Sequence, residues 1–198
     1  MDDPRARPLR EADLDADPLV QFRRWFEEAR AAVRVPEAMA LATASRDGAP
    51  SLRMVLLKEA GERGFAFFSG YDSRKGRDLV ANPRAAMLFY WDPLGRQVRV
   101  EGPVERLEED ASAAYFATRP PGAQAAARGT RQGQVVESRD QLEAAAREAG
   151  PGERPDWWGG YVLRPQAYEF WQHREDRLHD RLRYEPDPSG WRIVRLAP

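Results

Sequence analysis

The chain has 198 residues, of which 42% are hydrophobic, so it is long enough to bury a core and lacks the composition of a disordered protein. Charged residues make up 32%, yet the formal net charge is only −1, which argues against broad nucleic-acid binding. With no cysteine and two histidines, disulfides, thiol nucleophiles and metal sites are not expected. No signal-peptide or membrane-spanning pattern is present, so we expect a cytoplasmic protein.

The N-terminal part of the chain divides into a polar arm and a helix. Residues 1–17 are rich in Asp, Arg and Pro and predict a mobile arm, followed by a single domain over residues 18–198. Asp17 suits the N-cap position of a helix and Pro18 its first helical position. Apolar residues then recur at helical spacing, so we predict a helix that ends at about Val33.

Short apolar runs bounded by turn residues predict a chain dominated by strands. The expected strands cover residues 38–44, 51–58, 64–69, 85–91, 97–107, 160–163, 167–172, 178–184 and 191–196. Further helices are expected over residues 73–81, 108–118 and 138–149, whereas residues 122–136 receive no assignment. We therefore predict a mainly β fold with peripheral helices, in which a small barrel is covered by helices from outside.

A cationic segment near the C-terminus is the first candidate site. If a strand begins here, Arg177, His179 and Arg181 lie on one face and span roughly 13 Å, at about 3.3 Å per residue. Three cation-capable side chains in a row suit anionic or electron-rich ligands. A solvated edge strand with its polar face outward fits the same pattern, so both interpretations stay open.

Two cations, Arg53 and Lys58, bracket the apolar strand predicted over residues 51–58. A spacing of five places them on opposite faces of an ideal strand. A bulge, a twist or a wrapping ligand is therefore needed if both contact one cofactor. The alternative is that both are strand-end residues whose charged groups reach solvent.

Two further groups of polar residues suit phosphate. Ser73 is placed to cap a helix, and Arg74 and Lys75 follow it, where the free N–H groups of a helix N-terminus already favour an anion. Tyr115 and Arg119 lie four residues apart at a helix end and suit a second phosphate. Solvated surface residues are the alternative interpretation for both groups.

No arrangement of a catalytic triad, paired carboxylates or a phosphate-binding P-loop stands out in the sequence. The chemistry indicated is therefore that of a bound cofactor, which the protein orients and surrounds with charge. Trp157, Trp158 and Trp171 fit either a core or the wall of a site for a planar ring.

Seven segments in a fixed order carry a resemblance to one known family. They are RMVLLK (53–58), SRKGRDL (73–79), GRQVRVEGPVERL (95–107), YFATRP (115–120), EFWQ (169–172), RLHDRLRY (177–184) and RLAP (195–198). Over nearly its full length the chain resembles the pyridoxine/pyridoxamine 5′-phosphate oxidase family. The resemblance implies a split β-barrel that binds flavin mononucleotide (FMN) and works as a homodimer with FMN at the subunit interface.

The resemblance also implies roles for individual residues. The implied FMN contacts are Arg53, Val55, Lys58, Phe68, Ser69, Arg74, Lys75, Gln97, Gln132, Trp171 and Arg181. Among these, Arg74 and Lys75 would hold the FMN phosphate, and Gln97 would bond the flavin ring. The implied substrate contacts are Lys58, Tyr115 and Arg119 at the phosphate, and Arg177, Leu178 and His179 at the pyridine ring. Arg177 and His179 are the implied catalytic residues.

The reaction implied is oxidation of pyridoxamine or pyridoxine 5′-phosphate to pyridoxal 5′-phosphate, a step of vitamin B6 biosynthesis and salvage. Hydride would pass from the C4′ carbon of the substrate to flavin N5, and oxygen would reoxidise the flavin to give hydrogen peroxide. Arg177 would position the substrate, because a guanidinium stays protonated. His179 is able to exchange protons near neutral pH.

The chain departs from the family pattern at several positions. Ala123 stands where a serine is common. Gly133 stands where a hydroxyl residue often follows the FMN-contacting glutamine, which is Gln132 here. His173 and Arg174 replace a glycine-rich link after the EFWQ segment. Two other hypotheses therefore stay open. One is a related FMN oxidoreductase with another substrate, such as a phenazine-pathway oxidase, and the other is a non-catalytic protein that binds FMN or pyridoxal phosphate.

Overall fold

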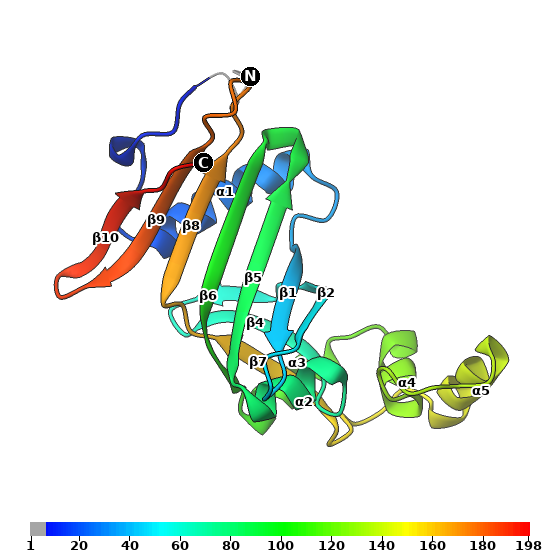
Figure 1. The fold of residues 1–198 in the computed structure, drawn as a ribbon. Helices are drawn as coiled ribbons and strands as arrows, with labels where there is room; N and C mark the ends of the chain where they lie inside the picture. The colour runs from blue at the N-terminus through cyan, green and yellow to red at the C-terminus, as the bar shows by residue number, and fades with distance from the viewer. Residues whose placement is uncertain (1–6) are drawn as a thin grey trace.

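The computed structural model describes residues 7–198, and over this range the chain forms one ten-stranded antiparallel sheet with helices around it (Figure 1). The strands are β1 (Ala38–Ala44), β2 (Pro50–Leu56), β3 (Glu59–Gly61), β4 (Gly64–Gly70), β5 (Arg84–Trp91), β6 (Arg96–Arg106), β7 (Trp158–Leu163), β8 (Ala167–Gln172), β9 (Asp180–Asp187) and β10 (Gly190–Arg195). The predicted mainly β class with peripheral helices is confirmed.

Five α-helices surround the sheet in the described range. They are α1 (Pro18–Ala32), α2 (Arg74–Ala81), α3 (Glu109–Ala117), α4 (Pro121–Gly129) and α5 (Arg139–Ala149), with 3₁₀ turns at Glu11–Asp13 and Asp92–Leu94. Ser73 caps α2 as predicted, since its side chain accepts a hydrogen bond from the N–H of Gly76. Within the described part of the chain, no helix is both long and apolar enough to cross a membrane.

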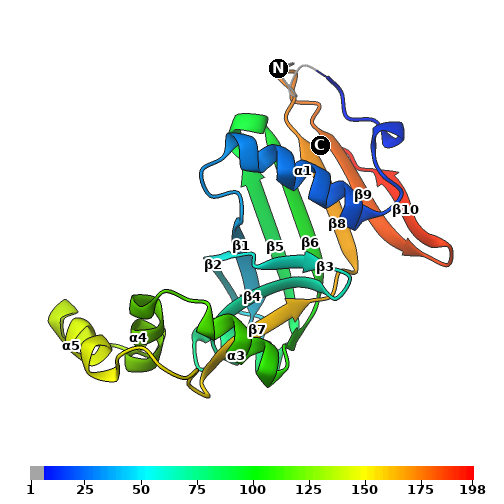
Figure 2. The ribbon, with the colours of Figure 1, turned by 180° about the vertical axis from the view of Figure 1, so that it is seen from behind.

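Strand β6 makes the sheet curl. The main path of the sheet runs β10-β9-β8-β6-β5-β1-β2. The long β6 pairs with β8 through residues 96–101 and with β7 through residues 104–106. Because β7 then pairs with β4, and β4 with β3, the far end of β6 leads into a second layer that closes under the first (Figures 1 and 2).

Helix α1 covers one side of the main sheet, where Figure 2 shows it crossing β5, β6 and β8. Its start is capped as predicted, because the side chain of Asp17 accepts a hydrogen bond from the Leu19 N–H at 2.8 Å. Phe22 on its inner face is fully buried. Its ring centroid lies 4.8 Å from that of Phe65 and 5.1 Å from that of Phe89, so the helix is anchored in an aromatic core.

The opposite face of the sheet exposes apolar side chains near one edge. Leu52 and Met54 on β2 are 69% and 64% exposed, and Tyr90 on β5 is 55% exposed. The strand register places Met54, through β1 and β5, on the same face as Arg99 of β6. An apolar patch on one half of a sheet face and charged residues on the other half are typical of a contact surface.

Strand β9 begins at Asp180, later than predicted, and this changes the cationic segment. Arg177 precedes the strand and has a φ of +66°, which is unusual for a residue with a side chain. The loop has hydrogen bonds of its own: Arg177 N–H donates to Arg174 O at 3.2 Å, and Arg174 N–H donates to His179 Nδ1 at 3.0 Å. The prediction that Arg177, His179 and Arg181 share one strand face is therefore wrong.

Residues 122–136 and the N-terminal arm are the two segments in which the structure adds to the sequence prediction. Residues 122–136 hold most of α4 and its connection to α5, and these helices project away from the sheet (Figure 1). Of the arm predicted to be mobile, residues 1–6 lie outside the described residues. Further along it, Leu9 is buried, donates its N–H to Asp180 Oδ2 at 2.9 Å and accepts from Arg195 Nη2 at 2.8 Å.

We predict that Phe22→Ala lowers the free energy of unfolding by about 3–5 kcal/mol, because it leaves a cavity among packed aromatic rings. The measurement is chemical denaturation of the purified protein. Val20→Ala is the matched control, since Val20 lies on the same helix but is 44% exposed, and we expect a change below about 0.5 kcal/mol. Equal losses in the two variants would contradict the assignment of Phe22 to the core.

Candidate functional site

A cavity of about 510 Å³ lies beside β2, β4 and α3 and contains many of the residues singled out in the sequence. The predicted residues in its lining are Arg53, Val55, Lys58, Phe68, Ser69, Lys75, Tyr115, Arg119 and Gln132, and we call them the cavity group. The lining also includes Trp158 and Ala123. One chain therefore brings together residues from three of the seven segments, 53–58, 73–79 and 115–120, together with Phe68, Ser69 and Gln132.

The end of β2 explains how Arg53 and Lys58 reach the same cavity. Arg53 lies within β2, but the strand ends at Leu56, and Lys58 lies in the gap before β3. The Lys58 N–H donates to Ala66 O at 2.8 Å, which ties this gap to β4. The change of direction between two strands, and not a bulge within one strand, lets both cations line one site.

Arg53 is held in place by polar groups of β1 and α2. Its Nη1 donates to Thr43 Oγ1 at 2.7 Å and to Leu41 O at 3.1 Å. Asp78 lies 3.9 Å from Nη2 and accepts from Thr43 Oγ1 at 2.6 Å. Burial lowers the pKa of Arg53, while Asp78 opposes that shift. Asp78 is not among the residues expected from the sequence, although a carboxylate on the inner side of a short helix signals a buried cation partner.

Lys75 is a buried cation whose contacts are neutral. Its Nζ lies 2.7 Å from Ser69 Oγ, 3.1 Å from Ser73 Oγ and 3.1 Å from Gln132 Oε1. Burial and the charge of Arg53 lower its pKa to about 8. No carboxylate forms an ion pair with Lys75 within residues 7–198. A buried ammonium at the start of α2 is suited to an anionic ligand.

The side chain of Gln132 marks where such an anion fits. Its Oε1 accepts from Ser69 Oγ at 2.8 Å, Gly70 N–H at 3.2 Å and Lys75 Nζ at 3.1 Å. Three donors thus converge on one oxygen atom. A phosphate oxygen needs the same kind of surroundings. Arg74 stays outside the cavity lining, with its Nη2 3.2 Å from Pro50 O.

A second cationic position lies against an aromatic wall. The Phe68 ring stacks on Tyr115 with centroids 3.8 Å apart and on Trp158 with centroids 5.5 Å apart. The Arg119 guanidinium lies 4.5 Å from the Trp158 ring centroid. Its Nη1 is buried without a hydrogen-bond partner, and burial lowers its pKa. An orphaned buried donor of this kind is suited to an anionic acceptor.

The remaining predicted residues gather elsewhere, and we call them the sheet group. They are Gln97, Trp171 and Arg181, which pair in register across β6, β8 and β9, and Arg177, Leu178 and His179 in the loop before β9. Arg181 donates from Nε and Nη2 to Glu169, at 2.8 and 3.2 Å, and from Nη1 to Ala197 O at 3.0 Å. Two of its five N–H groups stay available to a ligand.

His179 is oriented by the loop. Its ring centroid lies 4.8 Å from that of Trp171 and 5.2 Å from that of His173. Because Nδ1 accepts the Arg174 N–H at 3.0 Å, the neutral ring carries its proton on Nε2. His179 is thereby set up as a hydrogen-bond donor, which the sequence did not reveal.

The cavity group and the sheet group do not meet within one chain. Strands β2 and β9 are separated by five steps of the sheet, or about 24 Å at roughly 4.8 Å per step. The register also places them on opposite faces, because Met54, and not Arg53, shares a face with the sheet group. A ligand that contacts both groups therefore needs a second copy of the chain.

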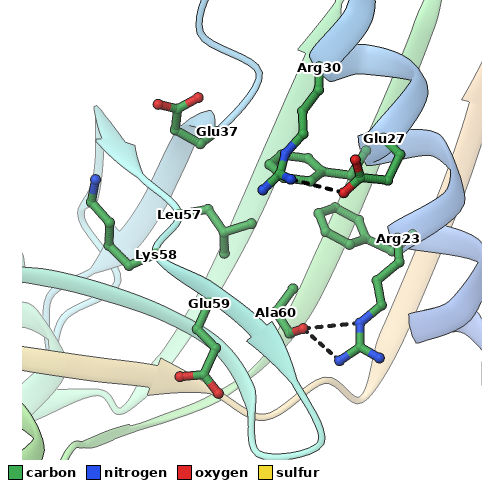
Figure 3. A pocket seen from close by; sticks show the side chains of 10 residues that line it. Arg23, Glu27, Arg30, Glu37, Leu57, Lys58, Glu59 and Ala60 are labelled. Carbon is green, nitrogen blue, oxygen red and sulfur yellow. Dashed lines mark hydrogen bonds and ion pairs between the residues drawn. The ribbon is translucent and has the colours of Figure 1, made fainter.

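A larger cavity of about 680 Å³ lies between α1 and residues 57–60 (Figure 3). Its charged groups are largely paired with near neighbours: Arg23 Nη2 donates to Ala60 O at 2.9 Å, and Arg30 lies 3.1 Å from Glu27. Figure 3 shows Lys58 at its rim, with the ammonium turned away from Arg23. This cavity holds none of the other residues singled out in the sequence.

Two family models match the chain, and the boundary between them resembles the separation of the cavity group from the sheet group. Residues 26–150 match the family model described as pyridoxamine 5′-phosphate oxidase. Residues 158–198 match the one described as the pyridoxine 5′-phosphate oxidase C-terminal dimerisation region. The sheet group, apart from Gln97, lies in this second match.

Individual relatives are similar over almost their whole length. The chain is 54% identical over 197 residues to the pyridoxine/pyridoxamine 5′-phosphate oxidase of Rubrobacter xylanophilus, covering 96% of this chain and 91% of the relative. It is also 54% identical over 198 residues to the enzyme of the same name from Bordetella pertussis, covering 96% and 93%.

Solved structures share the fold. PhzG from Burkholderia lata 383, in complex with tetrahydrophenazine-1-carboxylic acid, has a TM-score of 0.90 and 35% identity, covering 96% of this chain and 98% of PhzG. A pyridoxamine 5′-phosphate oxidase-related, FMN-binding protein from Nostoc punctiforme has a TM-score of 0.78 at 15% identity, covering 93% and 100%. The expected split β-barrel is confirmed.

The position of Lys75 predicts a pH-dependent anion affinity. Because its pKa is lowered to about 8, the ammonium loses its charge as the pH rises from 7 to 9. We expect the affinity for sulfate, which stays a dianion in this range, to fall by up to about tenfold. Isothermal titration calorimetry at several pH values measures this affinity. Lys75→Met should remove the pH dependence of sulfate binding, whereas Lys58→Met should leave that dependence unchanged. An unchanged affinity between pH 7 and 9 in the unmodified protein would refute the assignment.

Proposed function

Because this chain belongs to the pyridoxamine 5′-phosphate oxidase family, we propose that it oxidises pyridoxamine 5′-phosphate, pyridoxine 5′-phosphate or both to pyridoxal 5′-phosphate, with FMN as cofactor and oxygen as acceptor. The observation that carries the proposal is the presence in one cavity of two cations without carboxylate partners among the residues described: the buried Lys75, and the half-buried Arg119, whose Nη1 is buried without a hydrogen-bond partner. The reaction needs two phosphate sites, one for the cofactor and one for the substrate. Such an enzyme serves vitamin B6 biosynthesis or salvage.

The surroundings of Lys75 fit the phosphate of FMN. The buried ammonium, the N-terminus of α2 and the donors that converge on Gln132 Oε1 form a cradle for an anion. Arg53 adds a second fixed charge, and Arg74 lies beside the helix start. FMN, when bound, supplies two-electron oxidation and passes the electrons to oxygen.

The surroundings of Arg119 fit the phosphate of the substrate. The unpaired Nη1 gives a bound phosphate a buried donor, and stacking on Trp158 fixes the plane of the guanidinium. Lys58 and Tyr115 lie beside it, with Lys58 Nζ 6.0 Å from the Tyr115 ring centroid. These three side chains supply the charge and the hydroxyl that a phosphate monoester requires.

The separation of the two groups supports a homodimer with the site at the subunit interface. The sheet group of one copy would complete the cavity group of the other. The exposed apolar patch around Leu52 and Met54 supports such contact, and so does the match to a dimerisation region. A face-to-face pair of sheets buries this patch.

In this arrangement the sheet group acts on the substrate and the flavin ring. Arg177 stays protonated and positions the substrate, since a guanidinium has no accessible neutral form. His179 donates a hydrogen bond from Nε2, because its Nδ1 is occupied by the Arg174 N–H. Arg181 offers its two remaining N–H groups and its positive charge to the ring system.

A phenazine-pathway oxidation is the second candidate. PhzG, which was solved with tetrahydrophenazine-1-carboxylic acid, is 35% identical with a TM-score of 0.90. Ala123 in the cavity lining also offers no hydroxyl to a substrate phosphate. A substrate that carries a carboxylate in place of a phosphate would still find the Arg119 guanidinium.

The test is turnover by purified protein supplied with FMN, measured as peroxide and pyridoxal 5′-phosphate formed from each vitamer. We expect a yellow protein and turnover with at least one vitamer. Arg119→Ala should raise the KM for the phosphorylated substrate about 10- to 100-fold and leave FMN affinity within about twofold. Bound FMN without turnover of either vitamer would favour the phenazine-type substrate or a binding protein, and failure to bind FMN would refute both enzyme candidates.

A site shared between subunits predicts rescue in mixed dimers. Lys75→Met removes one half of the site and Arg181→Ala the other, so each variant alone should be nearly inactive. Refolding the two together should restore about a quarter of the full activity, because half of the dimers are mixed and each mixed dimer holds one intact site. Mixing Lys75→Met with Arg53→Ala, both in the cavity group, should restore none. Equal rescue in the two mixtures would exclude the shared site.

A further inference from the structure

Glu169 on β8 is a buried carboxylate with 4% of its surface exposed, whereas Trp171 on the same face of this strand is only half-buried. Its Oε1 accepts from Arg181 Nε at 2.8 Å, and its Oε2 accepts from Arg181 Nη2 at 3.2 Å. Oε2 also accepts from Arg99 Nη2 at 2.5 Å. One carboxylate is thus enclosed by two guanidinium groups.

The pairing with Arg181 does not follow from strand register alone. Directly opposite Glu169 on β9 stands Arg183, whereas Arg181 is paired with Trp171. Arg183 has a buried Nε without a hydrogen-bond partner and lies 3.8 Å from Glu185. Glu169 instead reaches the diagonal neighbour, a distance that long side chains can span.

The contact with Glu169 determines the position and orientation of the Arg181 guanidinium. Two parallel hydrogen bonds to one carboxylate fix both the position and the plane of a guanidinium. Ala197 O holds the third donor at 3.0 Å. The hydrogen bonds to Glu169 and its charge raise the pKa of Arg181, so the guanidinium stays charged. The two remaining N–H groups therefore point in a fixed direction.

We infer that Glu169 is a positioning residue that holds the Arg181 guanidinium in the orientation required to bind the flavin of FMN. The inference rests on the proposed function, in which Arg181 contacts FMN. Glu169 also offsets the repulsion between Arg99 and Arg181, which would otherwise lie side by side as like charges. Without Glu169, Arg181 keeps its charge but loses its fixed direction.

The test is the affinity of the ligand-free protein for FMN, measured by quenching of flavin fluorescence. Glu169→Gln keeps the shape of the side chain but loses the charge and one acceptor, so we expect the Kd to rise about tenfold. Glu101→Gln is the matched control, because Glu101 pairs with Arg99 at 2.9 Å on the same face and has no contact with Arg181. We expect its Kd to change less than about twofold.

A double-mutant cycle separates positioning from general damage. If Glu169 acts through Arg181, adding Glu169→Gln to Arg181→Ala should change the Kd by less than about twofold. A tenfold rise in both backgrounds, or no rise in either, would overturn the inference. If Glu169→Gln does not fold, Glu169→Asp keeps the charge and is expected to weaken FMN binding less, again only when Arg181 is present. Failure of the unmodified protein to bind FMN would refute the proposed function itself, and the inference with it.

Discussion

The burial of positive charge without a carboxylate partner is the constraint on which the site depends. Burying an unpaired ion is costly, so a fold keeps one only where another group repays the loss of water. Within the described residues, Lys75 has only neutral contacts and Arg119 keeps an unpartnered Nη1. The capped start of α2 and the aromatic wall beside Trp158 fix these two cations in place. The cavity is therefore preorganised for anions before a ligand arrives.

The curled sheet decides where the sheet group lies relative to the cavity group. Strand β6 belongs to both layers, since one end pairs with β8 and the other with β7. This connection fixes the cavity group at one edge of the sheet and the sheet group near the other. A single chain cannot close that gap without breaking the strand pairing, whereas two copies that meet face to face can. In the proposed dimer, association and ligand binding would therefore both follow from this order of strands.

Local patterns predicted local structure well and long-range contacts poorly. Asp17 and Ser73 each precede a helix and cap it as expected, because capping depends on a few neighbouring residues. The strand expected over residues 178–184 begins only at Asp180, because the hydrogen bonds of the preceding loop outweigh the alternating pattern. The resemblance identified the residues of both groups, but not their separation in one chain. The contact between Glu169 and Arg181 depends on a diagonal reach between strands, which no sequence spacing encodes.

The amide oxygen of Gln132 has a consequence for the outer part of the molecule. Gln132 lies between α4 and α5, which contain no buried residue and project from the sheet. Its three hydrogen bonds to Ser69, Gly70 and Lys75 help to attach this projection to the body. An anion that took over those donors would release the amide oxygen and weaken this attachment. Occupancy of the site and the local unfolding free energy of the projection would then be thermodynamically linked.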